Sequence, residues 1–154
     1  MRNEPGMSQI VQVVAQWLLG LVVVFGLAVA FFGHLTPGGG FAGGVIVACG
    51  FVLAALASGA RTGPAAWMKR HASTIDAGGA WIFVLVGFLG YLAGHFFQRW
   101  LALGEPFTLG SAVFIVLQNL AILLKVGGGL FAGFAAIAAF TSTGGEDEGS
   151  EADA

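Results

Sequence analysis

The residue best placed to do chemistry in this sequence is Lys125, a base near the middle of the long apolar run 109–140. Gln118 and Ser111 precede it at seven-residue intervals, so in a helix the three side chains share one face. A charge at the centre of a membrane helix costs about 2.5–3.5 kcal/mol on insertion scales, so Lys125 should face protein or water. The pattern predicts a polar stripe along an otherwise apolar helix.

Two roles remain open for Lys125. It lines or gates a hydrated ion path and exchanges protons there, or it is the permanent partner of a carboxylate on another subunit. The four apolar runs of the sequence contain no Asp or Glu. Both interpretations therefore predict a partner outside this chain, and the lack of a membrane carboxylate argues against a carrier that works alone.

A second stretch of unusual composition is GHLTPGGGFAGGVI, which covers residues 33–46. It formally contains G-x-G-x-x-G, but a dinucleotide loop needs a preceding strand and an acid about 20 residues later, and neither is indicated here. The start of a membrane helix explains the glycines better. Thr36 suits the N-cap of such a helix, and Pro37 suits its first turn.

Glycines at four-residue spacing within this stretch predict a close helix contact. Gly39 and Gly43 form one such pair, Gly40 and Gly44 the other, and each pair shares one helix face. His34 lies just before this helix start, where free N–H groups carry partial positive charge. The stretch either only packs helices or also borders an ion route. Its packing residues are Thr36, Pro37, Gly38, Gly39, Gly40, Phe41, Gly43 and Gly44.

Composition predicts an all-α integral membrane protein. Hydrophobic residues make up 57% of the chain and charged residues 9%, against about a quarter charged in soluble domains. A span needs about 20 apolar residues, and backbone groups in lipid must pair within a helix. We expect one membrane domain over residues 1–140, with four transmembrane helices at about 10–32, 38–59, 77–97 and 109–140. Five acids mark 141–154 as a disordered acidic tail: Glu146, Asp147, Glu148, Glu151 and Asp153.

The fourth run is longer than one upright span, so we expect it to tilt, to begin outside the hydrocarbon or to break at Gly127–Gly129. With four spans, both termini and the loop with Arg61, Lys69 and Arg70 lie on one side of the membrane. Loops rich in Lys and Arg favour the cytoplasmic side. The sequence thus predicts a multi-pass membrane protein with both termini cytoplasmic.

No pattern in the sequence indicates covalent chemistry or a bound cofactor. The single cysteine, Cys49, and the three histidines show no metal-ligand spacing, and no nucleophile–base pair is visible. The basic residues form no patch for nucleic acid. We expect a protein that is not an enzyme and that has no cofactor and no metal.

The block GHLTPGGGFAGG, residues 33–44, resembles the G-H-x-x-P-G-G-G-F-x-G-G signature of the MnhB/MrpB-type subunit of multisubunit Na⁺/H⁺ antiporters. The same domain occurs in related membrane-bound hydrogenase and oxidoreductase complexes. The four-span layout extends the resemblance over nearly the whole chain. The antiporter subunit has an acid in its last helix, whereas residues 118–129 of this sequence contain Lys125 and no acid.

The resemblance implies an accessory membrane subunit of a cation (Na⁺)/proton antiporter, which forms part of an ion translocation route and of the subunit interface. Its partners would be other membrane subunits, including large antiporter-like subunits, and the lipid bilayer. One alternative is the equivalent subunit of a redox-driven ion-pumping complex such as a membrane-bound hydrogenase. A further alternative is a stand-alone small multidrug-type exporter or a scaffold. The candidate ion-path residues are Lys125, His34 and Gln118.

Overall fold

The computed structural model describes residues 7–33, 35, 37–58, 63–93 and 113–151. It contains the α-helices α1 (Gln9–Phe31), α2 (Gly40–Ser58), α3 (Gly63–Leu89) and α4 (Val113–Glu151), with a short 3-10 helix η1 (Gly90–Ala93) after α3. The described residues contain no strand. Each of the four α-helices contains a stretch long and apolar enough to cross a membrane. The predicted all-α fold with four membrane helices is confirmed.

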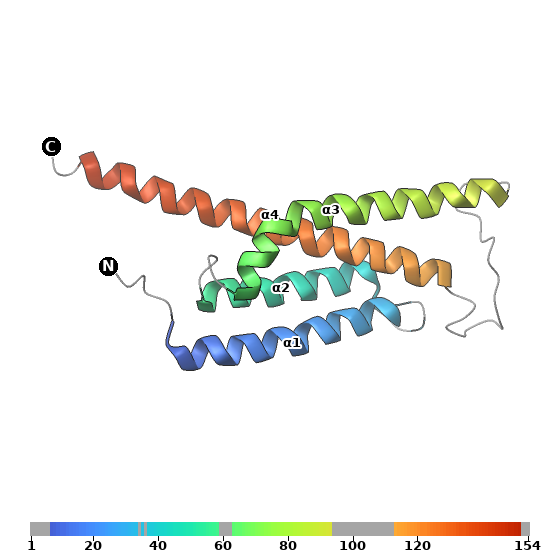
Figure 1. Cartoon of the computed structure of the whole chain (residues 1–154), viewed down its shortest axis with the longest axis horizontal. Helices are drawn as coiled ribbons and strands as arrows, with labels where there is room; N and C mark the ends of the chain where they lie inside the picture. The colour runs from blue at the N-terminus through green and yellow to red at the C-terminus, as the bar shows by residue number, and fades with distance from the viewer. Residues whose placement is uncertain (1–6, 34, 36, 59–62, 94–112, 152–154) are drawn as a thin grey trace.

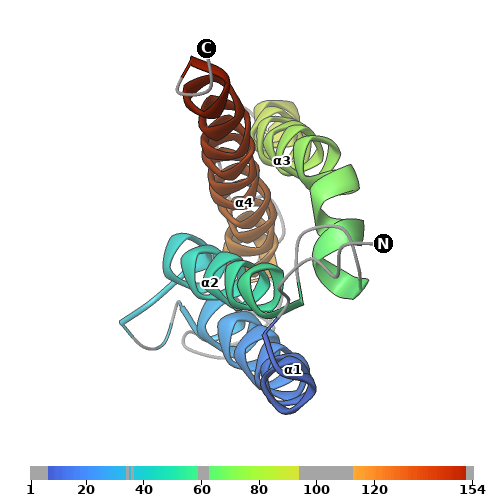
Figure 2. The same cartoon turned by 90° about the vertical axis from the view of Figure 1, so that its left-hand side faces the viewer.

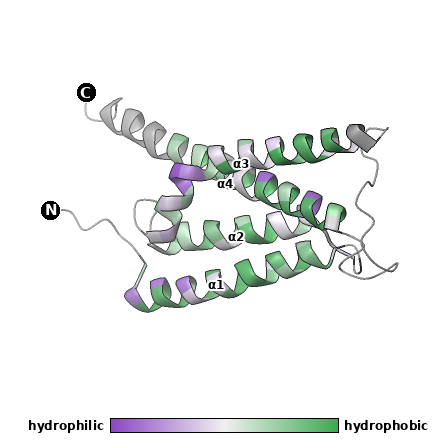
Figure 3. Ribbon diagram, turned by 45° about the vertical axis from the view of Figure 1, so that its right-hand side comes forward, coloured by the Kyte–Doolittle hydropathy of each residue, from purple (hydrophilic) through white to green (hydrophobic). Residues whose placement is uncertain are grey.

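Apolar side chains cover most of each helix instead of a single stripe. In Figure 3 most of the ribbon has the hydrophobic colour, and hydrophilic colour is seen at the start of α1, in the first half of α3 and toward the start of α4. Several large apolar side chains are strongly exposed, among them Trp17, Leu21 and Trp81. Helices that are apolar all round are typical of membrane spans, whose outer faces contact lipid or other subunits.

The helices form a bent row and not a closed bundle. Seen end-on in Figure 2, the order across the row is α1, α2, α4 and α3. The main contacts are α1 with α2, α2 with α4, and α4 with α3, whereas α1 and α3 do not touch in the described part of the chain. Along the length of the helices, α1 begins and α4 ends on the same side of the molecule, at the left in Figure 1. This arrangement leaves broad faces of the helices open to lipid or to other subunits.

Two clusters of small and apolar side chains join the helices. One joins α2, α3 and α4 through Ala55, Ala65, Met68, Ala72 and Phe131. The other joins α1, α2 and α4 through Ala30, Val47 and Leu123. The ring of Phe131 is fully buried and meets that of Phe51 edge-on, with centroids 6.2 Å apart. Because lipid is as apolar as these side chains, helix association depends on such close packing.

α3 begins at Gly63, well before the predicted start of the third span at Ala77. Lys69 and Arg70 make its first turns polar on average, which is why hydropathy alone predicts a connecting segment here. The other face of these turns carries buried residues at helical spacing, namely Ala65, Met68 and Ala72. Figure 1 shows the first turns of α3 crossing near the end of α2 before the helix runs along α4. The region is therefore an amphipathic extension of the third helix.

α4 is one helix that continues without a break through Gly127–Gly129. Of the three alternatives for the long fourth run, the break at these glycines is therefore wrong. A Cβ at Gly128 would collide with the backbone of α3, whereas a Cβ at Gly127 would make an ordinary contact with α2, 3.6 Å from the carbonyl oxygen of Gly44. The backbone is helical as far as Glu151, whereas composition predicts a disordered tail from residue 141. Once a helix has formed, each further residue adds a hydrogen bond without a new nucleation step, which favours this extension.

Candidate functional site

An ion pair lies between α3 and α4. Nζ of Lys125 donates a hydrogen bond to Oδ1 of Asp76 over 2.9 Å. In the chain by itself, 52% of the Lys125 side chain and 35% of the Asp76 side chain are exposed. Lys125 lies near the middle of the span Phe114–Phe140, about 16 Å from one end and about 22 Å from the other at a rise of about 1.5 Å per residue. If the span Phe114–Phe140 crosses the membrane, its length places Lys125, and the carboxylate that it contacts, within a hydrocarbon core about 30 Å thick.

The expectation of a partner outside this chain rested on the absence of a carboxylate from the four apolar runs. That premise is wrong, because Asp76 belongs to α3 of the same chain and contacts Lys125. Asp76 directly precedes the predicted third span, and hydropathy assigns it to a connecting segment. The spacing of the apolar residues before Asp76 indicates that the helix already includes this position. Ala65, Met68 and Ala72 continue a helical pattern that reaches Gly79, and Asp76 follows Ala72 by one turn.

Glycines bring the backbones of α3 and α4 close together beside the ion pair. A Cβ at Gly79 would lie 2.6 Å from the amide nitrogen of Lys125 and 2.7 Å from the carbonyl oxygen of Ala121. A Cβ at Gly128 would lie 2.7 Å from the carbonyl oxygen of Ala72. These distances are too short for real carbon contacts, so a side chain at either glycine would push the two helices apart.

Gln118 is a second polar group on this side of α4. It lies two turns before Lys125 on the same helix face and is 8% exposed. Among the described side chains it is the only buried polar or charged one. Its Nε2 and Oε1 have no hydrogen-bond partner in the described part of the chain. A buried polar group without a partner costs about 1–3 kcal/mol, so this amide is a weak point of the helix contact or a binding point for a polar group.

The glycine stretch forms the turn from α1 into α2. α2 begins at Gly40, and Gly39 before it has φ of 123°, a conformation that favours glycine. The carbonyl of Gly39 accepts a hydrogen bond from the amide of Gly43 over 3.0 Å, so Gly39 occupies the N-cap position. Pro37 therefore precedes the helix, and the prediction that it lies in the first turn is wrong. A Cβ at Gly33 would lie 2.6 Å from the Gly39 amide nitrogen, which shows how tightly this turn is packed.

Of the two predicted glycine pairs, Gly40 and Gly44 share a face of α2, whereas Gly39 precedes the helix and does not share a face with Gly43. A Cβ at Gly40 would collide with the backbone of Asn119 in α4. A Cβ at Gly44 would lie 2.9 Å from the carbonyl oxygen of Leu123, also in α4. Gly43 instead lies against the backbone of α1. The stretch thus joins α2 to both of its neighbours.

The structure separates the candidate residues into two groups. Lys125 contacts α3 through Asp76, and its seven-residue spacing places Gln118 on the same face of α4. Gly40 and Gly44 meet the side of α4 that faces α2. Gly38 and Phe41 are exposed. His34 and Thr36, and also Ser111, lie outside the described residues.

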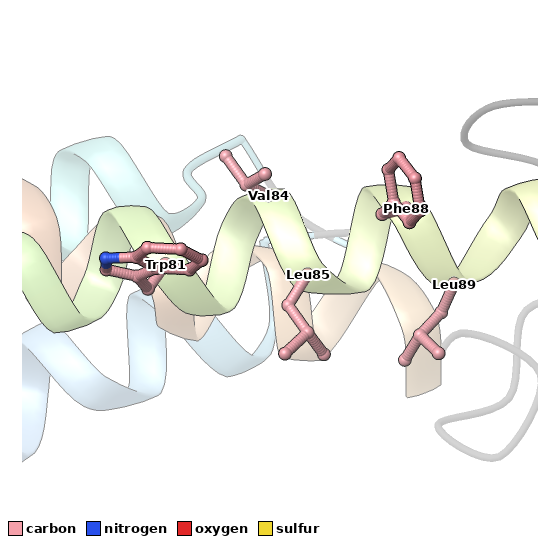
Figure 4. Close-up of a pocket in the computed structure, with 5 residues that line it drawn as sticks. All are labelled: Trp81, Val84, Leu85, Phe88 and Leu89. Carbon is pink, nitrogen blue, oxygen red and sulfur yellow. The ribbon is translucent and has the colours of Figure 1, made fainter.

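An apolar pocket of about 480 Å³ lies along the outer side of α3. Figure 4 shows the side chains that line it, which are Trp81, Val84, Leu85, Phe88 and Leu89. A small-molecule site normally adds a few polar groups that orient the ligand, and these side chains provide little of that kind. Within the described ranges, no three His, Cys, Asp or Glu side chains gather as they would around a metal ion. The Asp76–Lys125 pair is therefore the candidate site.

Comparisons with known proteins give a family model, a curated relative and a solved structure. Residues 10–132 match the model of a family described as a domain related to the MnhB subunit of Na⁺/H⁺ antiporter. MJ1307, an uncharacterised protein of Methanocaldococcus jannaschii, is 31% identical over 117 aligned residues, and the match covers 71% of this chain and 44% of that protein. A chain of the membrane-bound sulfane sulfur reductase, an archaeal respiratory membrane complex, is 27% identical with a TM-score of 0.68. That match covers 85% of this chain and 58% of the other, so the chain spans about half the length of these relatives.

Proposed function

The chain belongs to the family of domains related to the MnhB subunit of Na⁺/H⁺ antiporters, and on this premise we propose that it is an accessory membrane subunit of a multisubunit cation (Na⁺)/proton antiporter. In this proposal it forms part of an ion translocation route and of the interface with other membrane subunits. The family match and the likeness to a chain of a respiratory complex support the proposal. The observation that carries it is the Asp76–Lys125 ion pair at the depth of the membrane.

The ion pair explains why the chain would assist a route and not form one by itself. Charged residues inside membrane helices are costly, and they usually mark ion or substrate pathways. Asp76 is the only acid within the four spans, and Lys125 already neutralises it. A carboxylate held in this way binds another cation only when the ammonium group moves away. The exchangeable groups of a complete carrier must therefore come from companion subunits.

Within such a route the pair acts as a displaceable charge. A proton or a cation that reaches Asp76 competes with the Lys125 ammonium for the carboxylate. Once released, Lys125 repels a following cation, and this repulsion is stronger in a medium of low dielectric constant than in water. Gln118 offers donors and an acceptor to water on the same helix face. The pair thus has a role in gating, without covalent chemistry or a bound cofactor.

A second candidate function is that of the equivalent subunit in a redox-driven ion-pumping complex. The likeness to a chain of the sulfane sulfur reductase complex favours this alternative. The same ion pair would serve both kinds of complex, because the source of energy lies in other subunits. In this case the chain would belong to an oxidoreductase complex without being its catalytic subunit.

The proposed location is the inner (plasma) membrane of a prokaryote with both termini cytoplasmic. The start of α1, the end of α4 and the start of α3 lie toward the same side of the molecule, at the left in Figure 1. The first turns of α3 carry Lys69 and Arg70, both exposed. Basic residues next to spans favour the cytoplasmic side, which supports this orientation.

The companions of the chain decide between the two functions. We would tag the chain in its native membrane, extract it in mild detergent and identify co-purifying proteins by mass spectrometry. Large antiporter-like subunits without iron–sulfur proteins would support the antiporter, and hydrogenase-like or oxidoreductase-like companions would support the redox-driven complex. A chain recovered alone would contradict both.

Ion exchange by the intact complex in everted membrane vesicles tests the role of the ion pair. We expect Asp76→Asn to slow cation-driven proton exchange about tenfold, equivalent to a rise of about 1.4 kcal/mol in the barrier. Gly20→Ala is the control, because a Cβ at Gly20 meets nothing within 4 Å. An Asp76→Asn complex that assembles normally and exchanges ions at the full rate would contradict a role of this pair in the route.

A further inference from the structure

The exposed side of the α3–α4 contact combines charge with small residues. We use the name charged edge for Asp76, Ala80, Lys125, Gly129 and Gly133. Ala80 follows Asp76 by one helical turn, and Gly129 and Gly133 follow Lys125 by one and two turns, so each lies on the same face as its charged residue. A Cβ at Gly129 would lie 3.3 Å from Oδ1 of Asp76, whereas one at Gly133 would meet nothing within 4 Å.

Lipid is a poor environment for the charged edge. Half of the Lys125 side chain is exposed, at the depth of the hydrocarbon core. An ammonium group has three N–H donors, and the structure describes one hydrogen bond for them, to Asp76. The donors that remain need acceptors, which acyl chains do not have. The edge is therefore expected to contact protein.

The other helices of the described chain are badly placed to cover this edge. α1 does not touch α3 in the described part of the chain, and α2 meets α3 in the cluster of Ala55, Ala65 and Met68, in the first turns of α3 before Asp76. A water-filled cavity would also need walls on the lipid side, and the described helices of this chain do not supply them. Only helices and closed barrels satisfy their backbone groups in lipid. The small residues of the edge suit a helix, since its backbone could approach them closely.

We propose that a transmembrane helix of a companion subunit packs along the charged edge and places an acceptor oxygen of a side chain against Lys125. The cation is the more exposed member of the ion pair, so the companion residue is an acceptor and not a donor. The proposed function requires companions, and this inference rests on it in that respect. It goes further by assigning one face of the chain and one kind of contact.

Spin labels in the assembled complex test whether protein covers the edge. The native Cys49 is first replaced by Ala, and a nitroxide is attached at Gly133→Cys in the complex reconstituted in lipid nanodiscs. The matched control is Gly20→Cys, at a position in α1 that has the same open surroundings but strongly exposed apolar neighbours, Trp17 and Leu21. We expect the label at Gly133→Cys to be immobilised and shielded from both oxygen and a water-soluble nickel complex. Access of oxygen as in bulk lipid, or access of the nickel complex, would overturn the proposal.

Cross-linking identifies what covers the edge. A photoreactive benzophenone attached at Ala80→Cys or Gly133→Cys should cross-link to a membrane subunit of the complex when illuminated in native membranes. Cross-links confined to the same chain would overturn the proposal, even if the labels are shielded.

The acceptor contact is tested by removing both charges together. The double variant Asp76→Asn with Lys125→Gln leaves no unpaired charge, so the chain should still fold, but it loses the hydrogen bond from a charged donor. Such a bond corresponds to about tenfold or more in affinity. We expect at least about a tenfold lower yield of the cross-linked companion, and an unchanged yield would overturn the acceptor contact. If the unaltered chain co-purifies with no companion, the proposed function itself fails, whereas companions with an uncovered edge refute only this inference.

Discussion

α4 contacts α2 on one side and α3 on the other, and both contacts depend on glycine. On the α2 side, Gly40 and Gly44 meet the backbone of α4, and the neighbouring side chains Val47 and Leu123 are apolar and buried. On the α3 side, Gly79 and Gly128 bring the two backbones together, and Gly129 lies beside the carboxylate of Asp76. This contact contains an ion pair, and the same face of α4 carries the buried amide of Gln118. The α2–α4 contact thus depends on apolar packing, whereas the α3–α4 contact also contains charged groups, whose burial in the membrane costs free energy.

This difference separates the conspicuous motif from the candidate site. The stretch GHLTPGGGFAGGVI is the most distinctive part of the sequence, yet its glycines form the apolar contact. The charged groups lie in the contact between α3 and α4, which the family signature does not include. Helices in lipid associate through close packing, so glycine is needed wherever two backbones approach, whether or not ions pass nearby.

The largest expected effect is that of a side chain in the apolar contact. Gly40→Val would place a branched side chain where the backbone of Asn119 lies, and neither backbone can give way by rotating a side chain. Ordinary overpacking costs up to about 3 kcal/mol, and we expect this variant to exceed that and to yield little folded chain in detergent. Circular dichroism melts and gel filtration measure it. Gly20→Val, at an open position, is the control, and equal melting of the two variants would contradict the close contact.

The next largest effect is expected from removing the charges of the contact between α3 and α4. Asp76→Asn alone leaves Lys125 unpaired in the membrane and should lower the stability of the chain in nanodiscs by about 3 kcal/mol. Adding Lys125→Gln should restore most of this loss, because no unpaired charge remains. Unfolding by SDS titration measures both variants. If the double variant were as unstable as the sum of its two single variants, the ion pair would have no coupling energy.

A smaller effect is expected from alanine at two neighbouring glycines of α3, Gly78 and Gly79, which test how closely α3 packs against α4. A Cβ at Gly79 meets the α4 backbone at 2.6 Å, whereas a Cβ at Gly78 meets nothing within 4 Å. We expect Gly79→Ala to destabilise the chain by about 2 kcal/mol. Gly78→Ala should stabilise it by about 0.5–1 kcal/mol, because alanine is the better helix former. The same SDS titration distinguishes the two, and a loss of stability in both would show that α3 does not face α4 as described.

The smallest effect is expected at the buried amide. Gln118→Met keeps the length of the side chain and removes two polar atoms that have no partner in the described part of the chain. The change should therefore leave stability within about 1 kcal/mol or raise it. A loss of more than that in the assembled complex would mean that Gln118 bonds to water or to a companion there, and would add this amide to the polar contact.

Much of the fold could be predicted from the sequence, because the membrane leaves few alternatives to the helix. The four spans and the glycine contacts of α2 follow from apolar length and from four-residue spacing. The partner of Lys125 could not be predicted in the same way. Averaging over Lys69 and Arg70 hides the amphipathic start of α3, and with it the fact that Asp76 lies within a helix.

The sequence by itself determined the class of the protein, its four apolar helices, its family signature and the presence of a charge within the fourth run. These properties depend on composition and on local periodicity, which the chain carries residue by residue. Only the tertiary structure decided that α4 lies between α2 and α3, that Gly127–Gly129 do not break it, and that Asp76 is the partner of Lys125. Residues 76 and 125 are far apart in the chain, and their pairing depends on which backbones the glycines allow to approach.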